Sequence, residues 1–304
     1  MKKTVLLAVM TLSLFSCKKD DNNETTYSNA FPKTIVKDEV SNIGMVKTTE
    51  SYTLDSGNKI TSFTKKIVDN GTPTLDKSYT IDYNGNAIKS IVIRDISQNK
   101  NYTYNFIYSN GMVQSISSND NNLKINYDYV EGKVSTKTVV NGNDKRTFSY
   151  TYGANKIEMV SRQTGVSQND RFTYTLNADG TIASFKKITY IGNVPDATTE
   201  GTCSYQYDNK PNIFQRDVFK YLAEIEIATN NNYYGDYYRD PLLRTVAHNV
   251  VAYTNNLYNN THADYQDLEN ATRSFHYQWN SDNTPKSMEY KKNNNHKAKY
   301  TYNY

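Results

Sequence analysis

The chain has 304 residues and a formal net charge of +4 at pH 7, which falls to +2 once the two lysines of the leader described below are removed. This near-balance argues against a nucleic-acid-binding protein and against attraction to anionic membrane surfaces. Tyrosine accounts for 28 residues, and the mean hydropathy is −0.78. A core must therefore be built largely from tyrosine and phenylalanine, with isolated isoleucine and valine, on alternating strands.

The first residues have the pattern of an export leader. Met1-Lys2-Lys3 is a basic start, and the apolar run from residue 5 to 15 is too short to span a bilayer. The stretch 14–17, Leu-Phe-Ser-Cys, then resembles a lipobox, the recognition site for diacylglycerol transfer to the cysteine. We predict a lipoprotein signal peptide over 1–16 and a membrane anchor through a lipid on Cys17. The alternative is an ordinary secretory leader with an incidental cysteine.

Charged residues follow Cys17. Lys18-Lys19-Asp20-Asp21 resembles the export signal that directs some Gram-negative lipoproteins to the outer face of the outer membrane. The same residues would also serve as a solvated tether. We predict a flexible tether over 17–40, a single β-meander domain over 41–304, and a lipid-anchored protein on the outer membrane that faces the cell exterior.

The clearest repeat unit spans residues 102–116. Its first half has an aromatic residue at every second position, which places these side chains on one face of a strand: Tyr102, Tyr104, Phe106 and Tyr108. Asn110-Gly111 then tolerates the positive φ angles of a tight hairpin turn. Similar units begin at Tyr52, Tyr79, Ile125, Phe148, Phe172, Cys203 and Phe275.

These hairpins predict the fold class. Strands joined by short loops pair with their neighbours, and a flat meander of this length would expose its aromatic face. We therefore predict a mainly all-β protein, an antiparallel β-meander of about 16 strands that curls into a barrel or half-barrel with the aromatic face inward. Tyrosine rows can also stack on sugar rings, but core packing explains their period of two more simply.

One segment interrupts the strand pattern. After Pro211, apolar residues recur at helical spacing, with Asn212 as a helix cap: Phe214, Val218, Tyr221, Leu222 and Ile225. Asp240-Pro241 indicates a second helix start, whose apolar face would continue through Val250 and Tyr253, although Val250-Val251 would also suit a strand. We predict a helical insert over 211–272, with its helices near 211–260, that plugs or flanks the sheet.

Two resemblances follow from these motifs. The units with Tyr-x-Tyr followed by Asp or Asn, Gly and an aliphatic residue look like the tyrosine-aspartate repeats of large bacterial shell and toxin-carrier proteins. The order of motifs along the chain resembles that of a family of Gram-negative lipoproteins of unknown function, described as porin-like. The order is a lipobox, then aromatic hairpins, then the stretch 207–214 entering a helix, and finally the stretch 282–286 in the closing hairpin. Asn283 stands where that family usually has Gly, and Ile213 where it often has Pro. The family has no assigned catalytic residues to carry over.

The sequence offers few candidate catalytic, metal-binding or ligand-binding residues. Cys203 has no second cysteine in the mature domain to pair with, so we expect a small buried residue rather than a disulfide or zinc ligand. His262 and Asp264 form only a weak metal-like pair, and we predict no metal and no cofactor. The candidate ligand-binding residues lie between the two predicted helices: Tyr233, Tyr234, Asp236, Tyr237 and Tyr238.

Three functions remain open on the sequence. The first is a non-enzymatic surface lipoprotein that binds a glycan or a partner protein. The second is a polysaccharide-acting enzyme that uses Asp236 or Asp240, although a loop acid and a helix cap explain these residues more simply. The third is a membrane-spanning β-barrel, against which the polar outer face of the predicted strands argues.

Overall fold

The computed structural model describes residues 30–41, 44–230, 248–257 and 271–304. The leader, Cys17 and the candidate residues 233–238 and 240 lie outside this part of the chain, so the predictions that concern them stay predictions. The described residues form eighteen strands and one helix. The first nine strands are β1 (Thr34–Ser41), β2 (Gly44–Leu54), β3 (Ile60–Asp69), β4 (Thr72–Asn84), β5 (Ala87–Asp95), β6 (Lys100–Ser109), β7 (Met112–Ser118), β8 (Leu123–Val130) and β9 (Lys133–Asn141).

The second half of the chain continues the same pattern. Its strands are β10 (Asp144–Tyr152), β11 (Lys156–Gln163), β12 (Gln168–Leu176), β13 (Ile182–Ile191), β14 (Val194–Pro211), β15 (His248–Leu257), β16 (Ala271–Trp279), β17 (Pro285–Lys292) and β18 (Asn295–Asn303). The helix α1 (Asp217–Asn230) lies between β14 and β15 in the chain.

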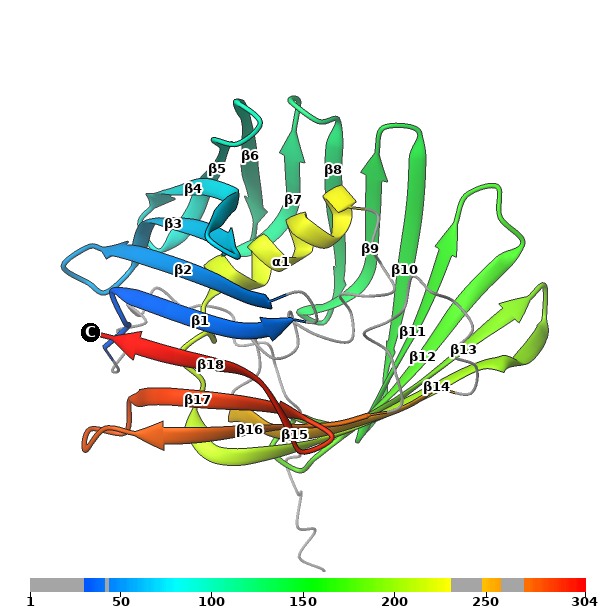
Figure 1. Ribbon diagram of the computed structural model, residues 1–304. Helices are drawn as coiled ribbons and strands as arrows, with labels where there is room; N and C mark the ends of the chain where they lie inside the picture. The colour runs from blue at the N-terminus through cyan, green and yellow to red at the C-terminus, as the bar shows by residue number, and fades with distance from the viewer. Residues whose placement is uncertain (1–29, 42–43, 231–247, 258–270) are drawn as a thin grey trace, which may run out of the picture.

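The sheet closes into a barrel. Each strand pairs antiparallel with the next one in the chain, and β18 pairs with β1, where Thr34 stands opposite Asn303 (Figure 1). The predicted antiparallel barrel is confirmed, with eighteen strands rather than about 16. The two missed strands are β1, which lies in the stretch predicted as tether except for its last residue, and β15, inside the stretch predicted as helical.

The strand alternation sorts side chains between the interior of the barrel, called the lumen below, and the outer face. On β6, Tyr104 and Phe106 are buried, and Tyr102 and Tyr108 pack against the same core. The inward orientation predicted for this aromatic row is therefore confirmed. One contiguous core fills much of the lumen and includes the apolar face of α1.

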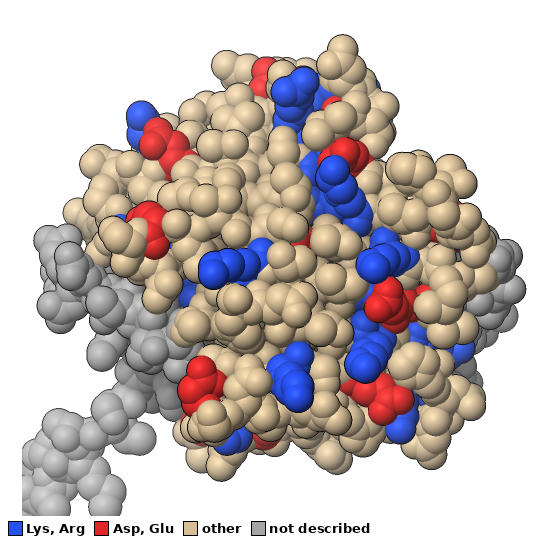
Figure 2. All heavy atoms as spheres, turned by 60° about the vertical axis from the view of Figure 1, so that its left-hand side comes forward, with Lys and Arg blue, Asp and Glu red and all other residues tan. Residues whose placement is uncertain are grey.

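The outer face is mostly polar. Asn105, Lys299 and Asn303 are exposed there, and exposed ion pairs such as Lys89–Asp82, with Nζ and Oδ2 3.0 Å apart, join neighbouring strands. Figure 2 shows acidic and basic side chains interspersed over one face of the molecule, with neither sign gathered into a single patch. The outer wall therefore carries the polar side chains that the sequence alternation predicts.

The hairpin turns use the residues that their backbone angles require. Asn110 and Gly111 have φ angles of 53° and 76°, the positive pair that a type I′ turn needs. In the loop before β17, Asn283 has a φ of 63°, much as Gly180 has 84° in the matching loop before β13. Asn283 therefore replaces the expected glycine without changing the turn, because asparagine tolerates the left-handed region.

The helix α1 lies inside the ring of strands (Figure 1) and packs its apolar face against the wall of the lumen. It begins at Asp217, later than predicted, because Asn212 Oδ1 accepts the backbone N–H of Phe214 at 3.0 Å and so caps a separate turn before the helix. Neither α1 nor any other helix in the described ranges is long and apolar enough to cross a membrane.

The prediction of a second helix is wrong for the described residues of that segment, 248–257. Val250 and Tyr253 lie on β15, which pairs with β14 on one side and β16 on the other. The spacing of the apolar residues is compatible with a helix or a strand. The segment is a strand because β14 and β16 supply partners for its backbone hydrogen bonds. The insert thus contains α1 and then returns to the barrel wall.

Polar contacts fix α1 to the wall. Lys137 Nζ on β9 lies 2.7 Å from Glu224 Oε2 on the helix and 4.6 Å from the centre of the Phe148 ring. At the C-terminal end of the helix, Asn141 Nδ2 donates to the backbone carbonyl of Ala228 at 2.9 Å. This amide satisfies one of the helix-end carbonyls, which have no partner within the helix.

Cys203 is buried, with 2 % of its surface exposed, as predicted. Burial raises the pKa of its thiol to about 11, so that roughly one thousandth of it is thiolate at pH 8. In a Cys17→Ala protein we expect Ellman's reagent to label no thiol within minutes at pH 8 and one thiol in 8 M urea. Rapid labelling of the folded protein would contradict the buried position.

Candidate functional site

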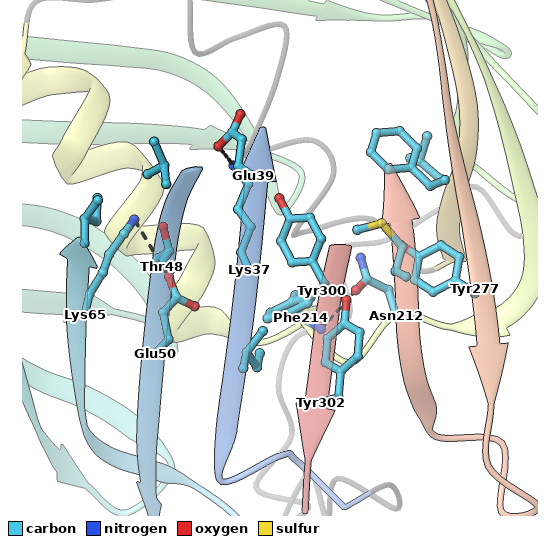
Figure 3. Close-up of a pocket in the computed structure, with 16 residues that line it drawn as sticks. Lys37, Glu39, Thr48, Glu50, Lys65, Asn212, Phe214, Tyr277, Tyr300 and Tyr302 are labelled. Carbon is cyan, nitrogen blue, oxygen red and sulfur yellow. Dashed lines mark hydrogen bonds and ion pairs between the residues drawn. The ribbon is translucent and has the colours of Figure 1, made fainter. Parts of the chain in front are cut away.

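A cavity of about 310 Å³ lies in the lumen where the inward face is not covered by α1. It is bordered by β1, β2 and β3 on one side and by β16, β17 and β18 on the other (Figure 3), and Val250 of β15 also lines it. These six strands are contiguous, because the closing pair β1–β18 lies in their middle. The cavity is called the lumen pocket below.

Strand register places one row of inward side chains across this wall. The cross-strand partners run from Tyr277 through Met288 to Tyr300, and from there through Lys37 to Thr48. All five line the pocket. Residues two positions away along each strand form the rows above and below, because alternate residues share a face.

The two sides of the pocket differ in chemistry. The β16–β18 side is aromatic, with Tyr277, Tyr300, Tyr302 and Phe275. Burial raises the pKa of Tyr277 well above its usual range, so its hydroxyl stays protonated and keeps its hydrogen-bond donor at neutral pH. This side therefore offers flat apolar rings whose hydroxyl groups lie at their edges.

The β1–β3 side carries four charged groups. Lys37 Nζ lies 2.5 Å from Glu39 Oε2, and Lys65 Nζ lies 3.8 Å from Glu50 Oε1 (Figure 3). Glu50 also accepts a hydrogen bond of 2.5 Å from the Tyr52 hydroxyl. The charges balance, so this side offers hydrogen-bond donors and acceptors without a net field that would favour one sign of ligand.

The floor of the pocket is the turn that leads into α1. Asn212 and Phe214 line the pocket, and the Phe214 ring meets Phe31 edge-to-face with ring centres 5.9 Å apart. Phe31 in turn contacts Tyr52 and Phe219 of α1, at ring-centre distances of 4.9 and 5.7 Å. The floor is therefore an aromatic cluster shared by the barrel wall and the helix.

The pocket is not the site that the sequence predicted. Tyr233, Tyr234, Asp236, Tyr237 and Tyr238 lie outside the described residues, so the structure neither brings them to the pocket nor separates them from it. Tyr277 and Tyr300 were assigned to the repeats, and Lys37 and Glu39 to the tether. The sequence signal that could have marked this stretch as a strand is the β-branched run Thr34-Ile35-Val36. Among the described residues, no group of three or more His, Cys, Asp or Glu side chains could hold a metal ion.

Comparison with known proteins gives similar solved structures at low sequence identity. No protein-family model matches the sequence, and no curated protein matches it. Two solved structures are described as porin-like proteins. The one from Bacteroides uniformis is 12% identical, with 89% of this chain and 96% of that chain covered and a TM-score of 0.45. The one from Bacteroides vulgatus is 12% identical, with coverage of 91% and 99% and a TM-score of 0.43.

A third similar structure is titled TcdB2-TccC3-TEV. It is 12% identical, with a TM-score of 0.41, and the likeness covers 82% of this chain but 11% of that one. At these similarities no functional residue can be transferred, so the function has to be argued from the residues of this chain.

Proposed function

We propose that this protein is a lipid-anchored surface scaffold that binds a carbohydrate in the lumen pocket. The observation that carries the proposal is the pairing of an aromatic side, with Tyr277 and Tyr300, and a hydrogen-bonding side, with Lys37 and Glu39. A sugar ring has an apolar face of C–H groups and a rim of hydroxyl groups. The apolar face would lie on the tyrosine rings, and the rim would meet the charged side chains.

A carbohydrate fits the pocket better than a partner protein. The cavity of about 310 Å³ is near the lower limit for small-molecule sites, which run from about 300 to 1,000 Å³. A stable protein–protein interface takes about 800 Å² from each partner, and a recess inside a barrel does not present such a surface. The glycan is therefore the favoured member of the two ligand classes left open by the sequence.

Binding is favoured over hydrolysis at this site. Glu39 and Glu50 are the pocket carboxylates, and both are engaged in ion pairs with lysines. A glycosidase needs one carboxyl group that is free to give a proton to the leaving oxygen. An enzyme that uses Asp236 or Asp240 stays a separate prediction, tested by replacing both and measuring polysaccharide cleavage.

The anchor is the part of the proposal that rests on the sequence. Cys17 and the charged residues after it support a lipoprotein on the outer membrane that faces the cell exterior. The polar outer wall supports display in water, because a barrel in a bilayer carries an apolar outer band. We expect a Cys17→Ala protein to be extracted without detergent and the unaltered protein to need it. A Cys17→Ala protein that still needs detergent would contradict this part.

Tyr300→Ala is expected to weaken carbohydrate binding at least tenfold, because it removes the ring next to Lys37 in the central row. The probes are cello-, xylo-, manno-, malto- and chito-oligosaccharides, tested by calorimetry on the full chain carrying Cys17→Ala. The matched control is Lys299→Ala, the exposed neighbour on the outer face of β18. Absence of binding to every probe, or equal losses in the two variants, would overturn the carbohydrate proposal.

A further inference from the structure

The lumen pocket has a closed end. At the end of the barrel where β1 begins and β18 ends, called the terminal end below, the floor residue Asn212 has 7 % of its surface exposed. Beneath it Phe31, Tyr52 and Phe219 pack ring against ring and are 2 %, 6 % and 3 % exposed. Side chains packed to this degree leave no passage for a polymer.

The pocket becomes more exposed toward the other end of the barrel. Three inward residues of β1 line it in order from the terminal end: Ile35, Lys37 and Glu39. Ile35 is 4 % exposed, whereas the Lys37 and Glu39 side chains are 25% and 36% exposed. On the neighbouring strand β2, the Glu50 side chain, which stands opposite Ile35, is 8% exposed. Among the described residues the mouth therefore lies near Glu39, at the end of the barrel opposite the terminal end.

The side walls are formed largely by paired strands. Antiparallel pairing runs from β16 through β18 and β1 to β3. On the other side of β16, where Val250 of β15 lines the pocket, β15 pairs with β16 from Ala252 to Asn255. Beyond this pairing, Lys210 of β14 bonds to Asn283 and lies 5.6 Å from the centre of the Trp279 ring. A chain cannot leave the pocket between hydrogen-bonded strands that lie about 4.8 Å apart. Within the described residues, the pocket thus has a floor, a wall and a mouth near Glu39.

From this shape we infer that the pocket takes the end of a glycan chain, one or two sugar units long, and not the middle of a chain. The inference rests on the proposed carbohydrate function and adds the part of the carbohydrate that is recognised. A site for the middle of a chain needs two openings so that the polymer can enter and leave. The terminal sugar would lie between Tyr300 and Lys37 and reach Asn212, and the next unit would lie toward Glu39 at the mouth.

The test compares lengths and ends of one sugar series. From the five series above, the best-binding one is taken as two-unit and six-unit linear chains and as a six-unit chain with a bulky fluorophore on each end. Calorimetry on the full chain carrying Cys17→Ala is expected to give two-unit and six-unit affinities within threefold of each other. The doubly capped chain is expected to bind at least tenfold more weakly, because neither of its ends fits the pocket.

The outcomes separate the two proposals. Equal binding of the capped and uncapped chains, or an affinity that rises with every added unit from two to six, would overturn the chain-end inference and leave carbohydrate binding in place. Absence of binding to any series would overturn both. Chains capped at one end only, reducing or non-reducing, identify which end enters the pocket.

Discussion

Phe106→Ala is expected to lower the free energy of unfolding by about 3 to 5 kcal/mol, the usual cost of removing a buried phenylalanine ring. Phe106 lies on the inward face of β6 and is 8 % exposed. Its ring meets Tyr221 of α1 nearly edge-on, with centres 5.3 Å apart. The substitution therefore removes packing between the wall and the lumen helix and leaves a cavity that neither rigid element can fill. Urea unfolding followed by tryptophan fluorescence or circular dichroism measures the loss.

The matched control is the next residue in the chain. Ile107 lies on the outer face of β6 and is 54% exposed. Ile107→Ala is expected to change the free energy of unfolding by less than about 0.5 kcal/mol, as for other exposed substitutions. Similar losses for the two variants would show that β6 is not sorted into inward and outward faces as the structure has it.

Glu224→Ala is expected to cost about 3 kcal/mol of stability, because it removes the carboxylate that neutralises the buried Lys137 ammonium group. The Lys137 side chain is 3% exposed, while that of Glu224 is 26% exposed, which places the effect at the lower limit for a buried ion pair. The Phe148 ring face remains beside the ammonium group but carries no full negative charge. The urea midpoint of the variant gives the measurement.

Two further variants isolate the ion pair. Glu226→Ala removes an exposed acid from the same helix and is expected to leave stability within about 0.5 kcal/mol. Lys137→Met combined with Glu224→Leu removes both charges and is expected to recover most of the loss, since apolar residues of similar volume often replace a buried pair without cost. A double variant as unstable as Glu224→Ala would show that the charge is not the cause.

The barrel could be predicted because its signals are local. A period of two in the aromatic residues and turns such as Asn110-Gly111 specify each hairpin, and short connections pair it with its neighbours. Closure follows from the aromatic face, which a flat sheet would leave in water. The helix pattern around Val218 and Leu222 was also readable, although the separate turn capped by Asn212 hid where the helix begins.

The candidate site could not be predicted, and the reason lies in β1. Its inward residues Lys37 and Glu39 are charged, so the strand lacks the apolar alternation that marks the others. They are charged because they line a pocket instead of a core. The strand that the sequence assigned to a tether thus lines the proposed ligand site, as expected where function overrides the local rules of folding. β15 was missed for another reason, since its valines suit a helix or a strand until its neighbours are known.

The pairing of β1 with β18 also determines at which step of folding the barrel closes. Thr34 and Asn303 are partners although they come from opposite ends of the chain, so their pairing must overcome the closure entropy of almost the entire barrel sequence. Until β18 is in place, β1 and β17 each present an open edge that can pair with another chain. The lumen pocket spans this same junction. The protein should therefore become able to bind its ligand only in the last step of folding, so that ligand binding can be used to detect closure of the barrel.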